Sequence, residues 1–510
     1  MKAHLMFPDR DFDADAELPS HAAILIEDLE LETIVAAMAG DDEVIRRVTT
    51  AALMAGPRND ADVIRYRQAA MADALGHADL MTELYNTAVR ALDSRRRQWW
   101  GAASRYASSV LHGAVELLRL CLDPLSEIAR LARANAGEVE SEAFRTLFAM
   151  LASELSPEYL AGIVAHLDAL RFRSGVPVSV GLGPGNELTD FVLRQQQTPE
   201  GPAWQRLFTR QRPSYTLRLD SRDEAGARAL GELRDRGVSL VADALADSAE
   251  HVLSFFTMLR TELAFYVGGV ALHRALTNVG VPTCVPAPAL PGTGRRSFTG
   301  LRDPVLALHL QHDPVANDCH ADGRGLIVIT GANQGGKSTF LRSVGVAQLL
   351  MQCGLFVTAE TFTADLCSGV FTHYKRAEDA SLVSGKFDEE LSRMADVTRS
   401  IQPHALLLLN ESFAATSARE GSEIARQVTQ ALVEAQVRVI FVTHLYDFAH
   451  TVFERSPDDV LFLRAERRAD RQRTFKVVQG EPLQTSFGAD VYDEVFSNMD
   501  APAPAGAVRP

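Results

Sequence analysis

A glycine-rich run between a predicted strand and a predicted helix has the residue types of a phosphate-binding loop. Residues 331–338 read Gly-Ala-Asn-Gln-Gly-Gly-Lys-Ser and fit the pattern G-x-x-x-x-G-K-[ST]. Glycines let backbone N–H groups surround phosphate oxygens, the lysine bridges the β- and γ-phosphates, and the serine hydroxyl ligates Mg²⁺. The apolar run "LIVIT" precedes the loop directly and "STFLRSVGVAQLL" follows it, as this motif requires. We therefore predict ATP and Mg²⁺ as cofactors, bound by Gly331, Ala332, Asn333, Gln334, Gly335, Gly336, Lys337, Ser338 and Thr339.

Two further predicted strands end in residues that suit hydrolysis. "HALLLLNES" ends in Asn410-Glu411, and "VRVIFVTHLYDF" contains Thr443-His444. A glutamate beside the metal position is able to deprotonate an attacking water, and a histidine ending the next strand is able to sense the γ-phosphate. Alone, each residue is more simply a solvated glutamate or an ordinary strand-end histidine. Together, after one phosphate loop, they favour catalysis by Glu411, His444 and Lys337, with Ser338 and Asn410 at the metal.

The elements that must position these residues alternate as strands and helices after about residue 301. We predict an α/β ATPase domain over 301–496, preceded by a Pro- and Gly-rich linker at 279–300 and followed by a disordered tail at 497–510. Apolar residues at helical spacing predict a mainly helical core and lever domain over 41–278, with a small β element at about 176–220. Residues 1–40 form an N-terminal segment. The fold class is thus α plus α/β, with an elongated helical region before the ATPase domain.

Composition narrows the environment and the partners. The chain has 510 residues, a net charge of −15 and five cysteines, none of them arranged Cys-x-x-Cys. The charge argues against a uniformly basic nucleic-acid coat but permits a local basic groove. Scattered cysteines, an acidic N-terminus without an apolar run and no long apolar stretch predict a cytoplasmic protein without a membrane span.

At this point the sequence resembles the MutS family of DNA mismatch-repair ATPases. The resemblance is specific from about 302 to 496, where "PVANDCHADGRGLIVITGANQGGKSTFLRSVGVAQLLMQCGLFVTAE", "LNESFAATSAREG", "FVTHLYDF" and "GEPLQTSFGADVYDEVF" match family segments. It implies an ABC-type ATPase domain, Asn317 as a further nucleotide-site residue, and a homodimer that engages double-stranded or structured DNA. The segment "FTHYKRAEDASLVSGKFDEEL" is similar to the family's signature loop, which implies that Ser384, Gly385 and Lys386 act on the partner subunit's nucleotide.

Three departures from the family pattern change what we expect. The Phe-x-Glu triplet that full-length relatives insert into DNA occurs only as 387–389, and the N-terminus is too short for the domain that carries it. Lys386 meets Phe387 directly, whereas the family has Ser-Thr before this phenylalanine. Asn410 stands where the family has an acid.

Two hypotheses follow from these residues. In the first, the protein is a nucleotide-driven dimeric clamp that hydrolyses ATP on DNA, in mismatch repair or a related repair or recombination process. In the second, it is a slowly hydrolysing switch that binds DNA or protein without mismatch specificity. Glu411 and His444 favour the first, and Asn410 with the shortened signature loop favours the second. The cluster Arg95, Arg96, Arg97, Trp99 and Trp100 suits a phosphate backbone, although a solvated helix face packed by its tryptophans explains it more simply.

Overall fold

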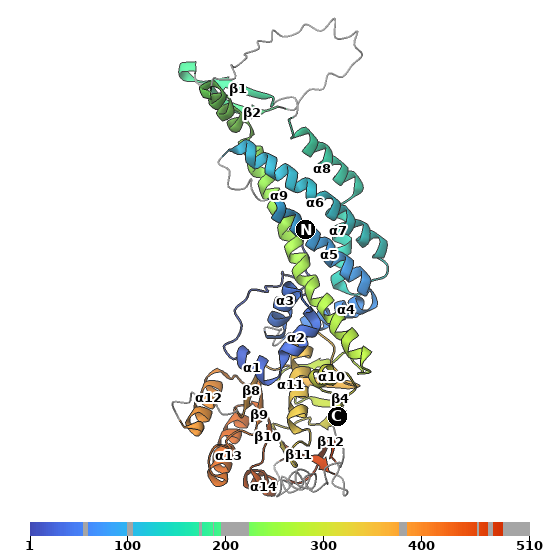
Figure 1. Ribbon diagram of the computed structural model, residues 1–510, viewed down its shortest axis with the longest axis vertical. Coiled ribbons are helices and arrows are strands. Elements are labelled where there is room, and N and C mark those ends of the chain that lie inside the picture. The colour runs from blue at the N-terminus through green and yellow to red at the C-terminus, as the bar shows by residue number, and fades with distance from the viewer. Residues whose placement is uncertain are drawn as a thin grey trace, which may run out of the picture. The chain divides into compact units, whose positions relative to one another are not determined.

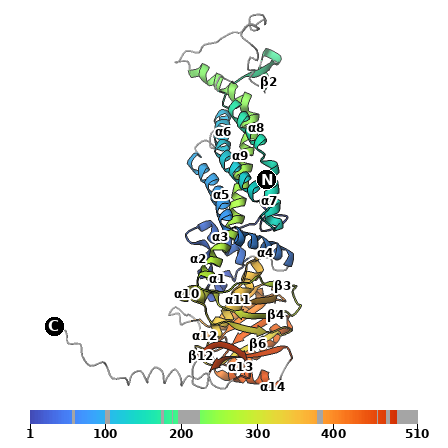
Figure 2. The ribbon, with the colours of Figure 1, turned by 90° about the vertical axis from the view of Figure 1, so that its right-hand side faces the viewer.

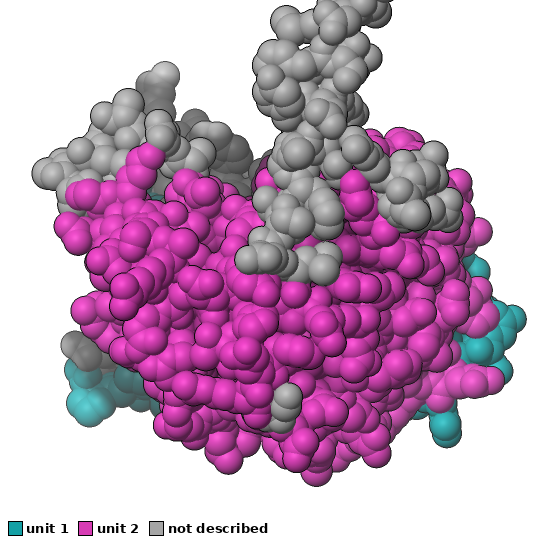
Figure 3. Space-filling model, turned by 90° about the horizontal axis from the view of Figure 1, so that it is seen from below, with its two compact units in different colours: residues 1–3, 82–139, 145–260 teal, residues 4–81, 140–144, 261–510 magenta. Residues whose placement is uncertain are grey.

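A computed structural model describes residues 1–54, 60–98, 106–172, 176–186, 188–194, 224–376, 385–455, 458–467 and 473–482. Figure 1 shows the chain as a ribbon, and its contacts divide it into two compact units, coloured separately in Figure 3. The first unit comprises residues 1–3, 82–139 and 145–260. The second comprises residues 4–81, 140–144 and 261–510. Each unit is therefore assembled from segments that are distant in the sequence.

The first half of the chain is helical, as predicted. Its helices are α1 (Ala22–Asp28), α2 (Leu31–Ala39), α3 (Glu43–Met54), α4 (Ala61–Gly76), α5 (Ala78–Gln98), α6 (Ala107–Asn135), α7 (Glu142–Glu154) and α8 (Pro157–Ala169). Local sequence explains where several of them begin. The Asp60 carboxylate accepts hydrogen bonds from the N–H groups of Asp62 and Val63 at the start of α4, and Ser156 caps α8 ahead of Pro157. The first unit has its own core, in which α6 and α8 pack on the 55-residue helix α9 (Glu224–Asn278).

The predicted β element is present as a short antiparallel hairpin. Strand β1 (Val178–Leu182) pairs with β2 (Leu188–Leu193), and the 3-10 turn η2 (Pro184–Asn186) joins them. The other strand predicted here, over 214–221, lies outside the described residues. Helix α9 is long and apolar enough to cross a membrane by composition, but 67% of its most apolar window is buried inside the protein, as in a core helix.

The second unit contains a six-stranded sheet with the order β12-β11-β6-β10-β9-β8, of which Figure 2 labels β6 and β12. Its strands are β6 (Leu326–Thr330), β8 (Val370–Tyr374), β9 (Leu406–Asn410), β10 (Arg438–Val442), β11 (Val460–Arg467) and β12 (Arg473–Gln479). All neighbours are parallel except β11 and β12, which are antiparallel. Parallel strands present their carboxyl ends at one edge, so Thr330, Asn410 and Val442 end side by side there.

Helices cover both faces of this sheet. Leu407 and Leu409 of β9 belong to a buried cluster with α12 (Lys386–Ser400), α13 (Ala418–Glu434) and α14 (Tyr446–Arg455). Leu408 points to the other face, toward α11 (Lys337–Cys353), where a Cβ atom on Gly345 would lie 2.6 Å from its Cδ1. A strand buried on both faces reads as an unbroken apolar run, which explains "LLLL". This architecture confirms the predicted fold class.

The segment 279–300, predicted as a linker, instead carries strands of a second sheet. That sheet has the order β3-β7-β4-β5, with β3 (Ala287–Ala289), β4 (Arg296–Leu301), β5 (Asn317–His320) and β7 (Thr361–Asp365). Proline and glycine made the segment look irregular. Proline is nevertheless tolerated in an edge strand, where one side of the backbone makes no ladder bonds, and Pro288 lies in the edge strand β3.

Within the second unit, a buried carboxylate ties residues 5–12 to the C-terminal part of α9. Glu262, on α9, is fully buried and accepts hydrogen bonds from the backbone N–H groups of Leu5, Met6 and Phe12. Arg67 donates to the carbonyl of Met6 at 2.7 Å and to that of Cys353, at the end of α11, at 3.3 Å. The contacts of this unit therefore cross the predicted boundaries at residues 40 and 278.

Candidate nucleotide site

The glycine-rich loop lies between β6 and α11, as the sequence predicted, and its backbone shape depends on glycine. Gly336 precedes α11 with φ +89°, a left-handed conformation that glycine adopts without strain. A Cβ atom there would also lie 3.1 Å from the carbonyl oxygen of Phe475 on β12. Gln334 has φ +57° and accepts a hydrogen bond from Arg473 at 2.7 Å. The backbone conformation of the loop is thus fixed by the start of α11 on one side and by β12 on the other.

Lys337 is the buried cation of the loop. Its Nζ donates hydrogen bonds to the carbonyl oxygens of Gly331 at 3.0 Å and Ala332 at 2.8 Å. Burial lowers the pKa of Lys337 to about 8, although the nearby Glu411 carboxylate opposes this shift. The positive charge of the Lys337 ammonium group is therefore only partly balanced by the surrounding protein. An anion bound in the loop would stabilise the charged form of this lysine.

Ser338 and Asn410 meet where a metal ion would bind. The hydroxyl of Ser338 donates a hydrogen bond to Oδ1 of Asn410 at 3.1 Å. Both oxygens are neutral, and the described residues contain no group of three or more His, Cys, Asp or Glu that could hold a metal. Mg²⁺ commonly takes one or two protein oxygens and completes its shell with phosphate and water oxygens. The pair therefore fits Mg²⁺ delivered with a nucleotide.

Glu411 and His444 form the second half of the site. Nε2 of His444 lies 3.0 Å from Oε1 of Glu411, and both side chains are about one-third exposed. The hydrogen bond from His444 and the charges of His444, Lys375 and Lys337 hold the pKa of Glu411 below its usual value, against burial, which raises it. Glu411 adopts φ +56°, because the chain turns sharply where β9 ends. These two residues, predicted from separate strands, are brought together by the parallel pairing of β9 and β10.

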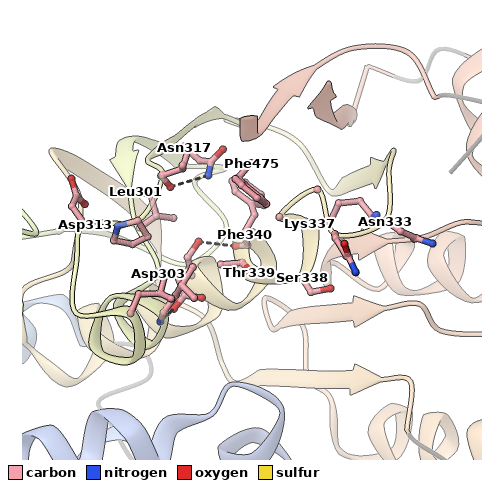
Figure 4. A pocket seen from close by; sticks show the side chains of 18 of the residues that line it. Leu301, Asp303, Asp313, Asn317, Asn333, Lys337, Ser338, Thr339, Phe340 and Phe475 are labelled. Carbon is pink, nitrogen blue, oxygen red and sulfur yellow. Dashed lines mark hydrogen bonds between the residues drawn. The ribbon is translucent and has the colours of Figure 1, made fainter. Parts of the chain in front are cut away.

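A cavity of about 620 Å³ opens beside the loop, lined by the predicted residues Asn317, Asn333, Gln334, Gly335, Gly336, Lys337, Ser338, Thr339 and Glu411 (Figure 4). Its other wall is largely apolar and includes Leu301, Leu306, Leu310, Val315 and Phe475. Asn317 accepts a hydrogen bond from the N–H of Val477 at 2.7 Å, which ties β5 to β12 behind Phe475. Asn317 therefore shapes the cavity wall.

Several residues of the site were not predicted. Asp303 lines the cavity with its carboxylate almost fully buried, and its Oδ2 accepts a hydrogen bond from Nε of Arg342 at 2.7 Å. Arg342 follows Ser338 by one helical turn, and it also pairs with Glu30 from the N-terminal helices. The spacing of Ser338 and Arg342 was visible in the sequence. The partners Asp303 and Glu30 were not, because they come from distant segments.

Of the predicted signature loop, Gly385 and Lys386 are described and Ser384 lies outside the described residues. Gly385 precedes α12, and Lys386 is its first residue. The structure does not bring either residue to the cavity of its own chain. The side chains of Arg95, Arg96 and Arg97, with both neighbouring tryptophans, also lie outside the described residues, as does the segment 483–496.

An ABC-type ATPase domain is defined by three features together: the phosphate loop, the glutamate and histidine at the ends of β9 and β10, and a flanking four-stranded mixed β sheet. Comparison with known families agrees. Residues 59–279 match the model of the MutS2 N-terminal domain, and residues 327–499 match that of MutS domain V. The chain belongs to the MutS family, in which domain V is the ATPase domain.

Individual relatives are distant. The chain is 30% identical over 259 residues to the DNA mismatch repair protein MutS of Protochlamydia amoebophila, an alignment that covers 47% of this chain and 30% of the relative. It is 26% identical over 321 residues to MutS of Synechococcus elongatus, covering 59% and 35% of the two chains. For MutS of Thermotoga petrophila the figures are 30% over 201 residues, covering 39% and 25%. The matched region is thus about one-third or less of the length of these curated relatives.

Proposed function

We propose that this protein binds ATP with Mg²⁺, hydrolyses it, and uses the nucleotide to control a homodimeric clamp on DNA. The observation that carries the proposal is the Glu411–His444 pair, 3.0 Å apart, at the sheet edge where Lys337 and Ser338 begin α11. A loop that only binds phosphate needs no such pair. A carboxylate with a lowered pKa, turned into the edge beside the loop, suits a general base for water.

The cavity suggests how the nucleotide lies. The apolar wall with Phe475 suits a planar base, because aromatic and aliphatic side chains pack against its faces. The N–H groups of the loop and of the first turn of α11 suit the phosphates, since a helix N-terminus favours anions. In this orientation the γ-phosphate lies toward Glu411.

Hydrolysis then assigns a role to each group. Glu411 accepts a proton as the water oxygen bonds to the γ-phosphorus, and the bond from that phosphorus to the leaving ADP oxygen breaks. His444 holds the carboxylate and keeps it ionised through their hydrogen bond. Lys337 stabilises charge on the β- and γ-phosphate oxygens. Bound Mg²⁺ supplies further neutralisation of the phosphate charge beside Ser338 and Asn410.

The DNA part of the proposal rests on the relatives, which are named as DNA mismatch repair proteins. That function belongs to whole proteins, of which this chain matches about one-third or less. We accordingly propose that the partner is DNA, double-stranded or structured, and we propose no specificity for mismatches. We also propose that the protein acts in the cytoplasm, in keeping with its five free cysteines.

Steady-state ATP hydrolysis with and without duplex DNA tests the proposal. We expect measurable turnover that requires Lys337 and changes when DNA is added. Lys337→Ala removes the loop cation and should abolish ATP binding while the helical first unit stays folded. Turnover that is absent, or that is identical in Lys337→Ala, would overturn the assignment. Turnover that is unchanged by every form of DNA tested would contradict DNA as the partner of this protein.

Asn410 favours a second candidate, an ATP-dependent binding switch that hydrolyses slowly. The amide keeps an acceptor oxygen toward Ser338 but has no negative charge. A hydrogen bond to a neutral group is weaker than one to a carboxylate by about 1 kcal/mol, so the metal is held less firmly. Asn410→Asp tests this role of residue 410 at the metal. A lower Mg²⁺ concentration at half-maximal turnover supports the metal role, and an unchanged one contradicts it.

A further inference from the structure

Lys375 lies beside Glu411, at a position that the hydrolysis scheme above does not use. Strand β8 pairs in parallel with β9, with Tyr374 opposite Asn410. The pairing continues one residue further, because the N–H of Lys375 donates to the carbonyl of Asn410 at 3.0 Å. Residue 375 therefore stands next to residue 411 across the two strand ends, and its side chain is exposed.

The neighbours of Lys375 fix the direction of its side chain. Successive side chains of an extended strand point to opposite faces. Arg376 pairs with Glu27 and, at 3.2 Å, with Asp28 on one face. His373 lies on the other face, where its Nδ1 is 2.7 Å from the hydroxyl of Ser412, the residue after Glu411. Lys375 directly follows Tyr374, the last residue of β8, so continuing the same alternation we expect its side chain on the face of His373 and not on that of Arg376.

The electrostatics of the site agree with this placement. The charge of Lys375 is one of those that lower the pKa of Glu411. The other carboxylates on the cavity wall, Asp303 and Asp313, are paired with Arg342 and Arg302 at 2.7 Å each. Among the described residues that line the cavity, Glu411 is thus the acid without an arginine partner. Its carboxylate is hydrogen-bonded to His444 and also interacts with the charges of Lys375 and Lys337, while Asn410 adds no charge.

We propose that Lys375 is a second phosphate-binding lysine of the nucleotide site, which allows this chain to hold the γ-phosphate of a nucleoside triphosphate even without a divalent metal. The inference rests on the proposed function, because it assumes that the γ-phosphate lies toward Glu411. The carboxylate of Glu411 repels that phosphate, and a neutral Asn410 retains the metal weakly. A lysine beside both supplies positive charge that only Lys337 and the metal would otherwise provide.

The experiment measures equilibrium affinity for ATP and for ADP, in EDTA and in Mg²⁺, with the full chain. In EDTA, Lys375→Gln should weaken ATP binding about tenfold, which corresponds to about 1.4 kcal/mol. The loss should be smaller in Mg²⁺ and smaller for ADP, which lacks the γ-phosphate. Lys375→Arg keeps the charge and should restore the affinity. Because residue 375 is exposed, thermal unfolding should be unchanged in both variants.

Two controls separate the possible failures. Arg399→Gln removes one positive charge from an exposed ion pair with Asp396 on α12 and should leave ATP affinity in EDTA unchanged. An equal loss in Arg399→Gln, or a Lys375→Gln affinity equal to that of the parent protein in EDTA, would overturn the inference. Lys337→Ala in the same assay tests the proposed function itself. If Lys337→Ala loses ATP while Lys375→Gln retains it, only the inference on Lys375 fails.

Discussion

Glu411 is the residue on which the distinction between an ATPase and a passive binder depends. Glu411→Gln keeps the size of the side chain and its hydrogen-bonding reach to His444 but removes the base. We expect ATP to bind and turnover to fall by about 10²- to 10⁴-fold, the range typical of a lost general base. Single-turnover hydrolysis measured beside nucleotide affinity checks this. Asp396→Asn, an exposed neutralisation on α12, is the matched control and should hydrolyse normally. Normal turnover in Glu411→Gln would contradict the role of this carboxylate.

Lys337 predicts how nucleotide affinity depends on pH. Its pKa is lowered to about 8 by burial, so the free protein loses this charge as pH rises through 8. Phosphates favour the charged form, and binding above pH 8 must therefore take up a proton. ATP affinity should be constant below about pH 7 and fall by about tenfold near pH 9, one unit above the pKa. Titration calorimetry in buffers of different ionisation enthalpy measures the proton uptake. Affinity that is flat from pH 7 to 9, without proton uptake, would contradict the prediction.

At the scale of elements, α11 lies close enough to the sheet to require glycine at position 345. A Cβ atom there would come within 2.6 Å of Leu408 and 3.1 Å of Leu29, both fully buried. Gly345→Ala should destabilise the second unit by about 1–3 kcal/mol through overpacking. Gly76→Ala, near the end of α4, has open space around the new atom and should be neutral or slightly stabilising. Hydrogen exchange of the α11 amides measures the difference in stability between the two variants. Equal protection in both would show that the sheet shifts to accommodate the added methyl group.

Glu262 links the N-terminal residues to α9 and makes the stability of the second unit depend on pH. Burial raises its pKa to about 7, despite the hydrogen bonds from Phe12, Leu5 and Met6. The folded state therefore binds more protons than the unfolded state between about pH 4.5 and 7, and this group's contribution to stability falls as pH rises through that window. Glu262→Gln should flatten this part of the pH profile of thermal unfolding. An equally steep profile in the variant would assign the dependence to other groups.

At the scale of the whole molecule, ABC-type sites are completed by a second copy, so we expect the signature loop to act on a partner subunit's nucleotide. Gly385 and Lys386 lie at the start of α12 and do not line the cavity of their own chain. We therefore predict that ATP with Mg²⁺ promotes dimerisation of the Glu411→Gln variant, because this variant keeps ATP bound without hydrolysing it. Light scattering gives the mass directly, and the variant that also carries Lys337→Ala should stay monomeric. A monomer at saturating ATP would contradict the prediction.

The sequence alone determined the parts of this protein that depend on contiguous residues. The phosphate loop, the apolar strand before Asn410 and Glu411, and the strand before His444 were predictable because backbone turns and two-sided burial impose residue types over short spans. The long helical region was predictable from its spacing of apolar residues. Pro288 makes residues 279–300 resemble a linker, because local irregularity in the sequence does not reveal an edge strand.

Tertiary structure alone decided which distant residues meet. Parallel pairing of β9 and β10 brings His444 to Glu411, and continued pairing of β8 brings Lys375 beside it. Arg342 gains Asp303 from 39 residues away and Glu30 from 312 residues away. A sequence shows the spacing within one element but not the register between elements. That register follows from burying both faces of the sheet at once, which is a property of the whole second unit.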